Sequence, residues 1–321
     1  MKHLFIVNPI SGKADAGLYS VPRFIEIAAR HKLDYQIEVT EYPNHACAIA
    51  KQAVAQHEEI RVYACGGDGT LNEVLHGVWS ASNPAAQVGA IPCGSGNDFI
   101  RNFGTQQEFA DIEQAVHAKP ITVDLIKTDD GIAASICSVG LDADIAYQIP
   151  KFRRLPFCGG STAYHLAILD RLSHRLHQRL LIEMDHTRLE DDFVIATVCN
   201  GSFYGSGFHA APQAALQDGL LDVVLVKKMS KFHLASLLSA YKKGKHIQNG
   251  GVTPLYQGMV QIYRTKHVTV RKVNGEPTIL NRDGECKTGA FLKTSILPSA
   301  IRFALPKEVY QRYLMQKSRI Q

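Results

Sequence analysis

The sequence predicts an α/β domain built on a parallel sheet, followed by a second domain that is mainly antiparallel β. Strand-like and helix-like runs alternate in the first part of the chain, which is typical of βαβ units, whereas strand-like runs dominate from about Ile121 onward. The length of 321 residues exceeds one average domain, so two substantial cores are expected.

The α/β prediction depends on short apolar runs separated by longer helix-like runs. Ligands bind outside the carboxyl ends of strands in open α/β sheets, so the turns after these runs are where chemistry is expected. The expected strands are residues 4–7, 35–39, 60–64 and 88–91, and the expected helices are residues 21–30, 46–56 and 71–79.

The β-rich prediction depends on apolar runs that recur through the second part of the chain. A last helix is expected over residues 307–321. The expected strands of this part are residues 121–127, 133–139, 180–184, 193–199, 220–226, 267–273 and 291–297.

Two helix-like interruptions of the β pattern carry basic residues beside an apolar face. Basic amphipathic helices can lie on membranes, but an apolar stripe packs on a core more often, so both alternatives are kept. The first interruption has Tyr164, Leu169, Leu172, Leu176 and Leu180 on one face, beside Arg171, Arg175 and Arg179. The second, residues 229–246, has Leu234, Leu237, Leu238 and Tyr241 as a stripe, followed by Lys242, Lys243 and Lys245.

The composition fits a soluble globular protein, with 45% hydrophobic and 20% charged residues. No apolar stretch approaches the roughly 18 residues of a membrane span, and Met1 leads into a short strand rather than a signal peptide, so the cytosol is the expected compartment. The seven cysteines form no C-x-x-C pair and indicate reduced core residues. A net charge of +5 suits phosphate-bearing ligands or an anionic membrane but is too weak to indicate nucleic acid.

The glycine-rich stretch Gly66 to Thr70 follows an apolar strand and precedes a helix-like run. Glycines let the backbone approach an anion closely, and the N–H groups of a helix start point toward it. Thr70 and Glu73 fit a capping box, so Thr70 is the expected N-cap of the helix. Asp68 would repel a bare phosphate, which indicates that a cation lies between the two.

Two further glycine-bearing turns follow expected strands, at residues 8–12 and 94–98. Gly12-Lys13 lacks the earlier glycine of a P-loop, and the turn that begins at Gly94 lacks the third glycine of a dinucleotide fingerprint. A P-loop enzyme and an ordinary Rossmann dehydrogenase are therefore not expected. The fourteen histidines show neither H-x-x-x-H nor H-E-x-x-H, so none is assigned to a metal.

Seven motifs in order, spread over residues 8–285, resemble the diacylglycerol kinase catalytic domain family, to which bacterial soluble lipid kinases and sphingosine kinases belong. The resemblance implies a three-layer α/β nucleotide-binding domain like that of NAD kinases and phosphofructokinases, and a β-sandwich-like second domain. The implied division is residues 1–124 plus 300–321, and residues 125–299. The motifs are N-P-x-S-G at 8–12, G-G-D-G-T at 66–70, G-S-G-N-D-F at 94–99, N-G-x-x-Y-G-x-G at 200–207, A-P-x-A at 211–214, D-G-x-L-D at 218–222 and D-G-E at 283–285.

The resemblance also implies which residues contact ATP. Thr40 has a local reason as well, because it ends an expected strand beside the same crevice. Ser95 stands where the family usually has threonine, and its hydroxyl keeps a phosphate contact plausible. The implied contacts are Asn8, Pro9, Ser11, Gly12, Thr40, Gly66, Gly67, Asp68, Gly69, Thr70, Leu71, Asn72, Gly94 and Ser95.

Phosphoryl transfer needs Mg²⁺ beside the phosphates and a carboxylate that receives the proton of the acceptor hydroxyl. By the resemblance, Asp68 and Asp98 organise Mg²⁺, and Glu285 is the general base facing the γ-phosphate from the second domain. A helix N-cap is the alternative role of Asp98. Cys286 replaces the proline that often follows the D-G-E motif, and Glu276, which precedes Pro277, is kept as the alternative base.

Asp218 is expected to bind a second, structural Mg²⁺ together with backbone carbonyls that map to Ala215 and Leu220. This assignment comes from the resemblance, and a sparse protein shell suits Mg²⁺ because the ion keeps several waters. The alternative is a β-turn at Asp218-Gly219 without a metal.

The expected function is an ATP- and Mg²⁺-dependent kinase of a lipid hydroxyl, with diacylglycerol as the leading acceptor. An NAD kinase and a non-catalytic lipid- or nucleotide-binding regulator are the alternatives. The expected partners are a lipid substrate at the inner membrane surface, through peripheral contact, and no nucleic acid. Relatives of this kind form dimers, and the oligomeric state stays open.

Overall fold

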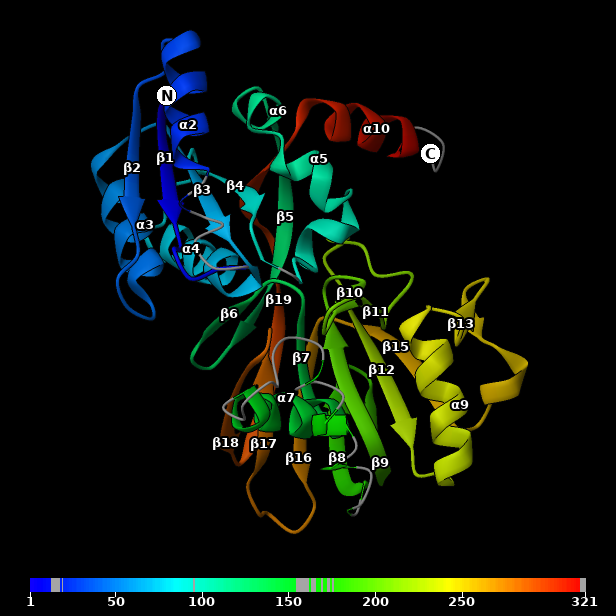
Figure 1. Cartoon of the computed structure of the whole chain (residues 1–321). Helices are drawn as coiled ribbons and strands as arrows, with labels where there is room; N and C mark the ends of the chain where they lie inside the picture. Colours follow the sequence, from blue (N-terminus) through cyan, green and yellow to red (C-terminus); the bar gives the residue numbers. More distant parts are fainter. Residues whose placement is uncertain are drawn as a thin grey trace. The chain divides into compact units, whose positions relative to one another are not determined.

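The chain folds into two compact units, as a computed structural model shows (Figure 1). Unit 1 comprises Met1–Asp124 and Pro298–Gln321, and unit 2 comprises Leu125–Leu297. The predicted class, an α/β domain and a β-sandwich-like domain, is confirmed. The structure describes residues 1–12, 18, 20–94, 96–153, 162, 166–168, 170–171, 174 and 176–317.

Unit 1 is built on a parallel sheet in the order β4-β3-β1-β2. The final part of β19 (Phe291–Leu305) joins β4 in parallel, with Arg302 opposite Gln87. Because these strands are parallel, their carboxyl ends meet at one edge of the sheet, and the three glycine-bearing turns follow at that edge. The four strands are β1 (Lys2–Val7), β2 (Tyr35–Val39), β3 (Ile60–Gly66) and β4 (Gln87–Pro92).

Helices cover both faces of this sheet and make unit 1 a three-layer structure. Helix α2 (Val21–Arg30) and helix α6 (Ile112–Val116) share a buried cluster with one face, in which the ring of Phe5 stacks on the ring of Phe24 at 4.8 Å. Helix α3 (His45–Gln56) and helix α4 (Asp68–Ser80) pack on each other and on β3.

The remaining helices of unit 1 lie near the end of the chain's first segment and at the C-terminus. They are η1 (Phe99–Asn102), α5 (Gln106–Ala110) and α10 (Lys307–Lys317). Arg312 of α10 binds the carboxylate of Glu108 at 2.6 Å, which fastens α10 to α5. The predicted C-terminal helix is thus confirmed over the described residues.

Unit 2 consists mainly of antiparallel strands. The long strand β9 (Thr187–Cys199) organises it, because β9 pairs with β7, β8 and β12. The other long strands are β7 (Ile136–Gly140), β8 (Gln178–Met184), β12 (Leu221–Lys227), β15 (Val260–Thr265), β16 (His267–Lys272), β17 (Thr278–Arg282) and β18 (Glu285–Gly289). Strand β5 (Lys119–Thr128) crosses the unit boundary, and the short elements are β6 (Gly131–Ala133), β10 (Phe203–Tyr204), β11 (Phe208–His209), β13 (Ile247–Gln248), β14 (Gly251–Val252) and η2 (Pro254–Tyr256).

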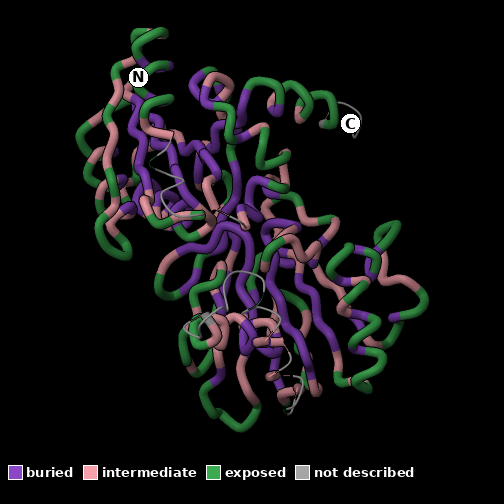
Figure 2. The backbone as a smooth tube through the Cα atoms, viewed as in Figure 1, coloured by how far each residue is buried: buried purple, intermediate pink, exposed green. Residues whose placement is uncertain are grey.

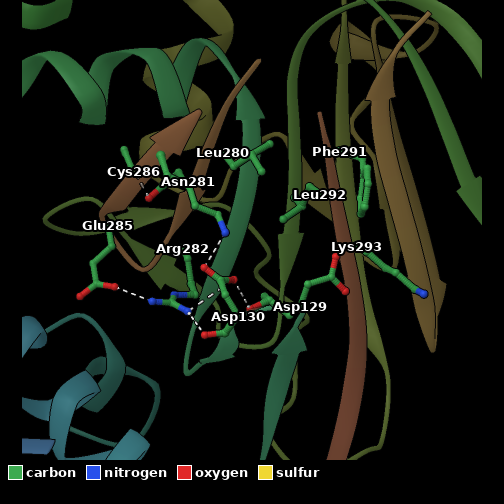
Figure 3. Close-up of a pocket in the computed structure, with 12 residues that line it drawn as sticks. Asp129, Asp130, Leu280, Asn281, Arg282, Glu285, Cys286, Phe291, Leu292 and Lys293 are labelled. Carbon is green, nitrogen blue, oxygen red and sulfur yellow. Dashed lines mark hydrogen bonds and ion pairs between the residues drawn. The ribbon is translucent and has the colours of Figure 1, made fainter. Parts of the chain in front are cut away.

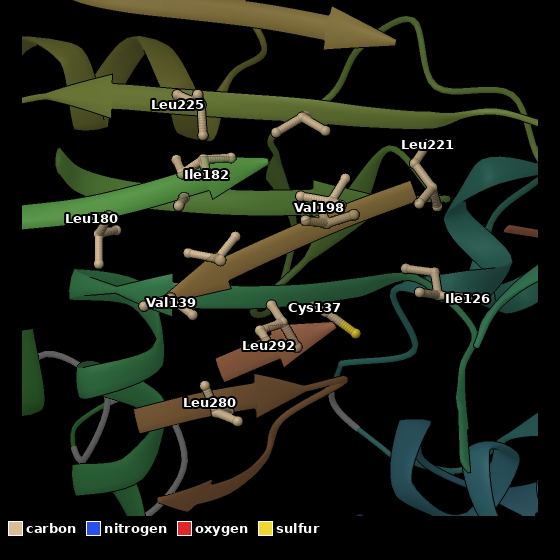
Figure 4. Close-up of a cluster of buried hydrophobic side chains, with 14 of the residues drawn as sticks. Ile126, Cys137, Val139, Leu180, Ile182, Val198, Leu221, Leu225, Leu280 and Leu292 are labelled. Atoms are coloured by element: carbon tan, nitrogen blue, oxygen red, sulfur yellow. The ribbon is translucent and has the colours of Figure 1, made fainter. Parts of the chain in front are cut away.

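The apolar side chains of unit 2 form two buried clusters. One gathers residues of β7, β8, β9, β12, β16 and β17, such as Val139, Ile182 and Leu280 (Figure 4). The other lies beneath helix α7 (Leu141–Arg153) and helix α9 (Lys231–Lys242). The tube of Figure 2 shows the strands of both units as the buried part of each.

Three expectations about unit 2 need correction or limitation. Helix α7 was not predicted, because its residues mix acidic, apolar and proline positions without a clear stripe. The apolar stripe predicted for α9 packs on the core, since Leu234, Leu237 and Tyr241 are buried. Leu180 belongs to strand β8 instead of a helix. Tyr164, Leu169, Leu172 and Arg175 lie outside the described residues.

The cysteines described by the structure are free thiols, in line with the expectation of reduced residues, and Cys158 lies outside the described part. Within that part, no helix combines the length and apolarity that a membrane crossing requires.

Candidate active site

The turns after β1 and β2 begin the candidate nucleotide site of unit 1. The backbone N–H of Asn8 donates to the carbonyl of Cys65 at 3.0 Å, and that of Thr40 donates to the carbonyl of Val7 at 2.9 Å. Asn8 also accepts the N–H of Ile10 at 3.1 Å, which shapes the turn that contains Pro9 and Ser11. Gly12 has φ of 84°, a conformation that favours glycine.

The glycine-rich stretch after β3 places a helix start without a side-chain cap. Helix α4 begins at Asp68 with Gly67 as its N-cap, and a glycine has no side chain that could accept the first N–H groups of the helix. Such N–H groups are available to an anion. The prediction that Thr70 is the N-cap is therefore wrong: Thr70 lies in the first turn, buried, and its hydroxyl accepts a hydrogen bond from the side-chain amide of Asn8 at 3.0 Å.

Glu73, the expected partner of Thr70 in a capping box, caps a different helix. Its carboxylate accepts the backbone N–H of Asn44 at 3.0 Å and that of Ala46 at 3.1 Å, at the start of α3. The S/T-x-x-E pattern is present, but the carboxylate of Glu73 accepts hydrogen bonds from the start of α3 instead of from Thr70. The glycine turn is thereby free of side-chain capping from both residues.

The turn after β4 approaches the turn after β3 at backbone distance. A Cβ on Gly94 would lie 2.8 Å from the Cα of Gly67, and a Cβ on Gly96 would lie 2.6 Å from a carboxylate oxygen of Asp68. The first contact meets backbone and requires glycine at position 94, whereas the second meets the end of the Asp68 side chain, which can move. Ser95, between them, lies outside the described residues.

Asp68 and Asp98 are brought together by this close approach. The backbone N–H of Asp98 donates to the carboxylate of Asp68 at 2.7 Å, and the carboxylate of Asp98 pairs with Nε of Arg101 at 3.2 Å. Asp98 also precedes η1 as its N-cap residue, but its side chain makes no cap hydrogen bond. Asp98 therefore has the position of a helix N-cap, the alternative role predicted for it, but its side chain does not cap the helix.

The residues around this pair fit a bound cation. Asn72 is 6% exposed, and its side-chain oxygen accepts no hydrogen bond from the residues that the structure describes. A buried oxygen of this kind is costly without a partner. Asn72 lies one turn after Asp68 in α4, on the same helix face, and its oxygen is of the kind that Mg²⁺ prefers.

Glu285 of unit 2 stands on a turn that Asp283 holds in place. The carboxylate of Asp283 accepts the backbone N–H groups of Ala134, Ser135 and Ile136, at 2.5, 3.0 and 2.8 Å. Asp283 has φ of 47°, a conformation uncommon for a non-glycine residue. Burial raises the pKa of Asp283, although the three backbone donors oppose this shift.

Glu285 lines a cavity of about 210 Å³ within unit 2, together with Asp130, Arg282 and Lys287 (Figure 3). The guanidinium of Arg282 binds the carboxylate of Glu285 at 2.7 Å and the carbonyl of Asp130 at 3.2 Å. The ammonium of Lys287 binds the carboxylate of Asp130 at 2.5 Å. Burial alone would raise the pKa of Asp130, but Lys287, Thr128 and Arg282 outweigh it and lower that pKa.

Burial raises the pKa of Cys286, the residue after Glu285, and that of Asp142, whose charge acts on Cys286. Burial, assisted by the acidic side chains Asp142 and Asp144, raises the pKa of Cys286 to about 12, so its thiol is no nucleophile at neutral pH. Burial also raises the pKa of Asp142 to about 6, although the hydroxyl of Thr197 donates to its carboxylate at 3.0 Å.

Glu276, the alternative base, lies in a different environment. It is exposed and belongs to the turn between β16 and β17, whereas Glu285 follows the other end of β17. Its backbone N–H donates to the side chain of Asn274 at 3.2 Å. The cavity beside Glu285 does not include it.

Asp218, the expected ligand of a structural metal, takes part in a turn and an ion pair. Its carboxylate accepts the N–H of Leu220 at 3.0 Å and contacts the guanidinium of Arg264. Asp222 lies on the other side of Arg264, whose Nε is 3.6 Å from its carboxylate. Arg264 therefore supplies positive charge where the metal was expected, and a cation bound to Asp218, Ala215 and Leu220 would compete with it.

Several residues of these sites were missed by sequence reasoning. Arg282 contacts Glu285 locally, across the hairpin of β17 and β18. Asp130, from the turn between β5 and β6, reaches Arg282 only through folding. Arg264 is 46 residues from Asp218. Asp283 could have been recognised, since it is the acid of the D-G-E motif and its place before a glycine suggests a turn.

Each of the two units matches the model of a known protein family. Residues 2–128 match the family described as Diacylglycerol kinase catalytic domain. Residues 135–305, more than half of the chain, match the family described as YegS C-terminal NAD kinase beta sandwich-like domain.

Relatives extend over most of the chain. A diacylglycerol kinase from Bacillus subtilis is 26% identical over 286 residues, covering 87% of this chain and 88% of the relative. A Shewanella frigidimarina protein described as "Probable lipid kinase YegS-like" is 25% identical over 249 residues, covering 77% and 76%. A crystal structure of a diacylglycerol kinase from Bacillus anthracis superposes with a TM-score of 0.68 over 96% of this chain and 98% of that one, and its 19% identity limits the likeness to the fold.

These matches follow the order of the motifs and include both the glycine turns of unit 1 and the Glu285 turn of unit 2. A kinase of this kind uses ATP as its phosphoryl donor. The protein is therefore a kinase that belongs to the diacylglycerol kinase catalytic domain family.

Proposed function

We propose that this protein transfers the γ-phosphoryl group of ATP to a lipid hydroxyl in the presence of Mg²⁺, with diacylglycerol as acceptor and phosphatidic acid as product. The observation that carries the proposal is the contact between Asp68 and Asp98 among glycine turns at an uncapped helix start. Membership of the family and the names of its relatives support a lipid acceptor.

The residues of unit 1 bind and orient the donor in this proposal. The N–H groups at the start of α4 donate to phosphate oxygens, and the turn that begins at Asn8 lies beside them through the contact of Asn8 with Thr70. Asp68, Asp98 and Asn72 would hold Mg²⁺, which supplies charge neutralisation at the phosphates. The glycines at 67, 94 and 96 keep this region free of Cβ atoms.

The acceptor step needs a base, and Glu285 is the proposed one. The acceptor oxygen forms a bond to the γ-phosphorus, the bond from that phosphorus to the β,γ-bridging oxygen breaks, and ADP leaves. The hydroxyl proton passes to the carboxylate of Glu285. Arg282 holds this carboxylate in place, and Asp283 fixes the turn that carries it.

A radiolabelled ATP assay over a panel of acceptors tests the proposal. The panel contains diacylglycerol, phosphatidylglycerol, a sphingoid base and NAD, each with Mg²⁺ and with a chelator. Labelled phosphatidic acid that depends on Mg²⁺ is the expected product. Label confined to NAD would replace the proposal with an NAD kinase, and label in none of the acceptors would support the regulatory alternative.

The NAD alternative stays in the panel for a specific reason. Residues 135–305 match a family whose description names an NAD kinase-like β sandwich. The glycine-rich stretch Gly66 to Thr70 also suits any ATP-dependent kinase of this architecture. The D-G-x-L-D motif at residues 218–222, in contrast, favours the lipid kinases.

A lipid acceptor requires contact with a membrane, and we assign that contact to the N-terminal end of α9. Phe232 is 91% exposed and Leu255 is 66% exposed, although both are large apolar residues. The hydroxyl of Tyr256 lies 3.2 Å from that of Ser236, so η2 and α9 are neighbours. Lysines of α9 and its flanks suit an anionic leaflet, and a cytosolic, peripheral location follows.

A homodimer stays a prediction, which light scattering checks.

A further inference from the structure

A cluster of two histidines and a glutamate lies in unit 1 and has no part in the proposed reaction. His31 follows the last residue of α2, Glu113 lies in α6, and His117 follows the last residue of α6. The two helices contact each other, which brings His31 close to Glu113 and His117, although both lie more than eighty residues further along the chain. Sequence patterns of neighbouring histidines do not detect this arrangement, because His31 is distant from His117 in the chain.

The ligand atoms of these three side chains converge. One nitrogen of each imidazole and one carboxylate oxygen all lie within 4.8 Å of one another. The Nε2 atom of His31 contacts Oε1 of Glu113, and Nε2 of His117 lies 3.9 Å from the same oxygen. The two imidazole rings are 4.7 Å apart between centroids and nearly perpendicular, at 87°. Both rings thus direct an Nε2 atom toward one carboxylate oxygen.

The surroundings hold the cluster in position. The guanidinium of Arg30 binds the other oxygen of Glu113, Oε2, at 3.3 Å, which leaves Oε1 directed at the histidines. Arg61 is 3% exposed and donates to the carbonyls at the end of α6. The guanidinium nitrogens of Arg61 lie 3.3 Å from the carbonyl oxygen of Ala115, 3.2 Å from that of Val116 and 2.9 Å from that of Ala118. The backbone on both sides of His117 is therefore fixed.

We propose that His31, Glu113 and His117 form a binding site for a divalent transition-metal ion of the Zn²⁺ class. Two imidazole nitrogens and one carboxylate oxygen are a ligand set that Zn²⁺ takes in proteins, with a fourth position left to water. Imidazole does not suit Mg²⁺, which distinguishes this site from the cation of the phosphoryl transfer. Arg30 orients the ligating carboxylate, as outer-shell partners do.

The site lies at the opposite edge of the sheet from the glycine turns. Arg61 is the second residue of β3 and contacts the segment that carries His117, whereas Gly66 ends the same strand. A strand of 7 residues separates the two edges, a span of about 20 Å at the usual rise per residue. The metal would therefore connect α2 to α6 and stabilise unit 1 without touching the reacting groups.

Zn²⁺ binding to the full-length, untagged protein tests the proposal. The competing ligand is a chromophoric chelator, and Co²⁺ serves as a second probe, since its visible absorption reports on coordination geometry. We expect one tight Zn²⁺ per chain and a rise of the melting temperature with Zn²⁺. The variants His117→Asn and Glu113→Gln should each bind Zn²⁺ at least about tenfold more weakly, the lower bound for losing even an outer-shell partner.

His57→Asn is the matched control, because His57 is another histidine of unit 1 that lies outside the cluster. It should bind Zn²⁺ as the natural protein does. Equal melting temperatures of the metal-free proteins show that the variants fold. Absence of tight Zn²⁺ binding, or binding that neither variant weakens, would overturn the proposal. None of these measurements depends on kinase activity, so they are independent of the acceptor's identity.

Discussion

The glycine turns of unit 1 and the Glu285 turn of unit 2 are built in opposite ways. In unit 1 the backbone forms the site: Gly94 approaches Gly67 so closely that a side chain would collide, and α4 starts without a side-chain cap. In unit 2 side chains form the site, since Asp283 binds three backbone N–H groups and Arg282 holds Glu285.

This difference explains what each region tolerates and what each can do. A backbone site offers fixed N–H donors, which suit phosphate because every nucleotide presents the same oxygens. A side-chain site offers a carboxylate whose position depends on its neighbours, which suits proton transfer. Substitutions should therefore act differently in the two units, and five of them test that comparison.

Glu285→Gln is expected to have the largest effect. The amide cannot accept the acceptor's proton, so kcat should fall by about 10²- to 10⁴-fold, the usual contribution of a general base. The melting temperature should change little, because Glu285 is exposed. Steady-state phosphorylation of diacylglycerol measures the effect. Glu276→Gln is the control, and the reverse result, with only Glu276→Gln inactive, would move the base to Glu276.

Asp68→Asn tests the metal side of the backbone site. Loss of the charge should reduce kcat/KM by about a hundredfold, because removing one stabilising group of a charged transition state costs roughly that much. The Mg²⁺ concentration for half-maximal activity should also rise. Asp34→Asn, which removes an exposed acid of unit 1 that pairs with Lys2, is the control. Unchanged Mg²⁺ dependence in Asp68→Asn would contradict the assignment.

Asp142→Asn tests an acidic side chain of unit 2 whose pKa is raised by burial. Burial raises the pKa of Asp142 to about 6 in the folded protein, whereas an unfolded aspartate titrates near about 4. The folded chain then retains a proton that the unfolded chain has lost, so this carboxyl makes stability fall as the pH rises from about 4 through 6.

The asparagine variant removes that dependence. Relative to the natural protein, it should gain up to about 3 kcal/mol of unfolding free energy at neutral pH and show a smaller gain near pH 4. Urea unfolding at both pH values measures the difference. Groups common to both proteins cancel in this comparison. An equal stability difference at the two pH values would show that Asp142 titrates normally.

Phe232→Ser tests the membrane contact of unit 2. Burial of a phenylalanine contributes about 1.5–3 kcal/mol, so partial insertion should make its loss weaken vesicle binding by about tenfold. Co-sedimentation with anionic vesicles provides the measurement. Leu314→Ser is the control, because Leu314 is an exposed apolar residue of α10 in unit 1. Equal weakening by both changes would remove the assignment to α9.

Asp218→Asn should have the smallest effect. Arg264 pairs with Asp218 at an exposed position, and such pairs contribute about 0–1 kcal/mol. If Mg²⁺ binds here, it should raise the melting temperature of the natural protein and not that of the variant. Thermal melts of both proteins, with and without Mg²⁺, check this. If Mg²⁺ leaves the melting temperature of both proteins unchanged, Asp218 binds Arg264 and no Mg²⁺.

The sequence predicted the parallel sheet and the glycine turns because these depend on local patterns. Apolar runs of the right length marked β1 to β4, and glycines marked the turns after three of them. Thr70 shows the limit of local patterns: it fits a capping box, yet α4 begins at Asp68, and Glu73 binds the start of α3 instead. Helix α7 was missed because its stripe is interrupted.

The sequence by itself determined the fold class, the family and the identity of the acidic residues, because motifs and apolar periods are properties of neighbouring residues. Tertiary structure decided which residues touch. It joined Asp68 to Asp98, brought Arg282 to Asp130, paired Asp218 with Arg264, and gathered His31 with Glu113 and His117. Such contacts depend on how separate elements pack, and no local pattern records the packing of residues that lie far apart in the chain.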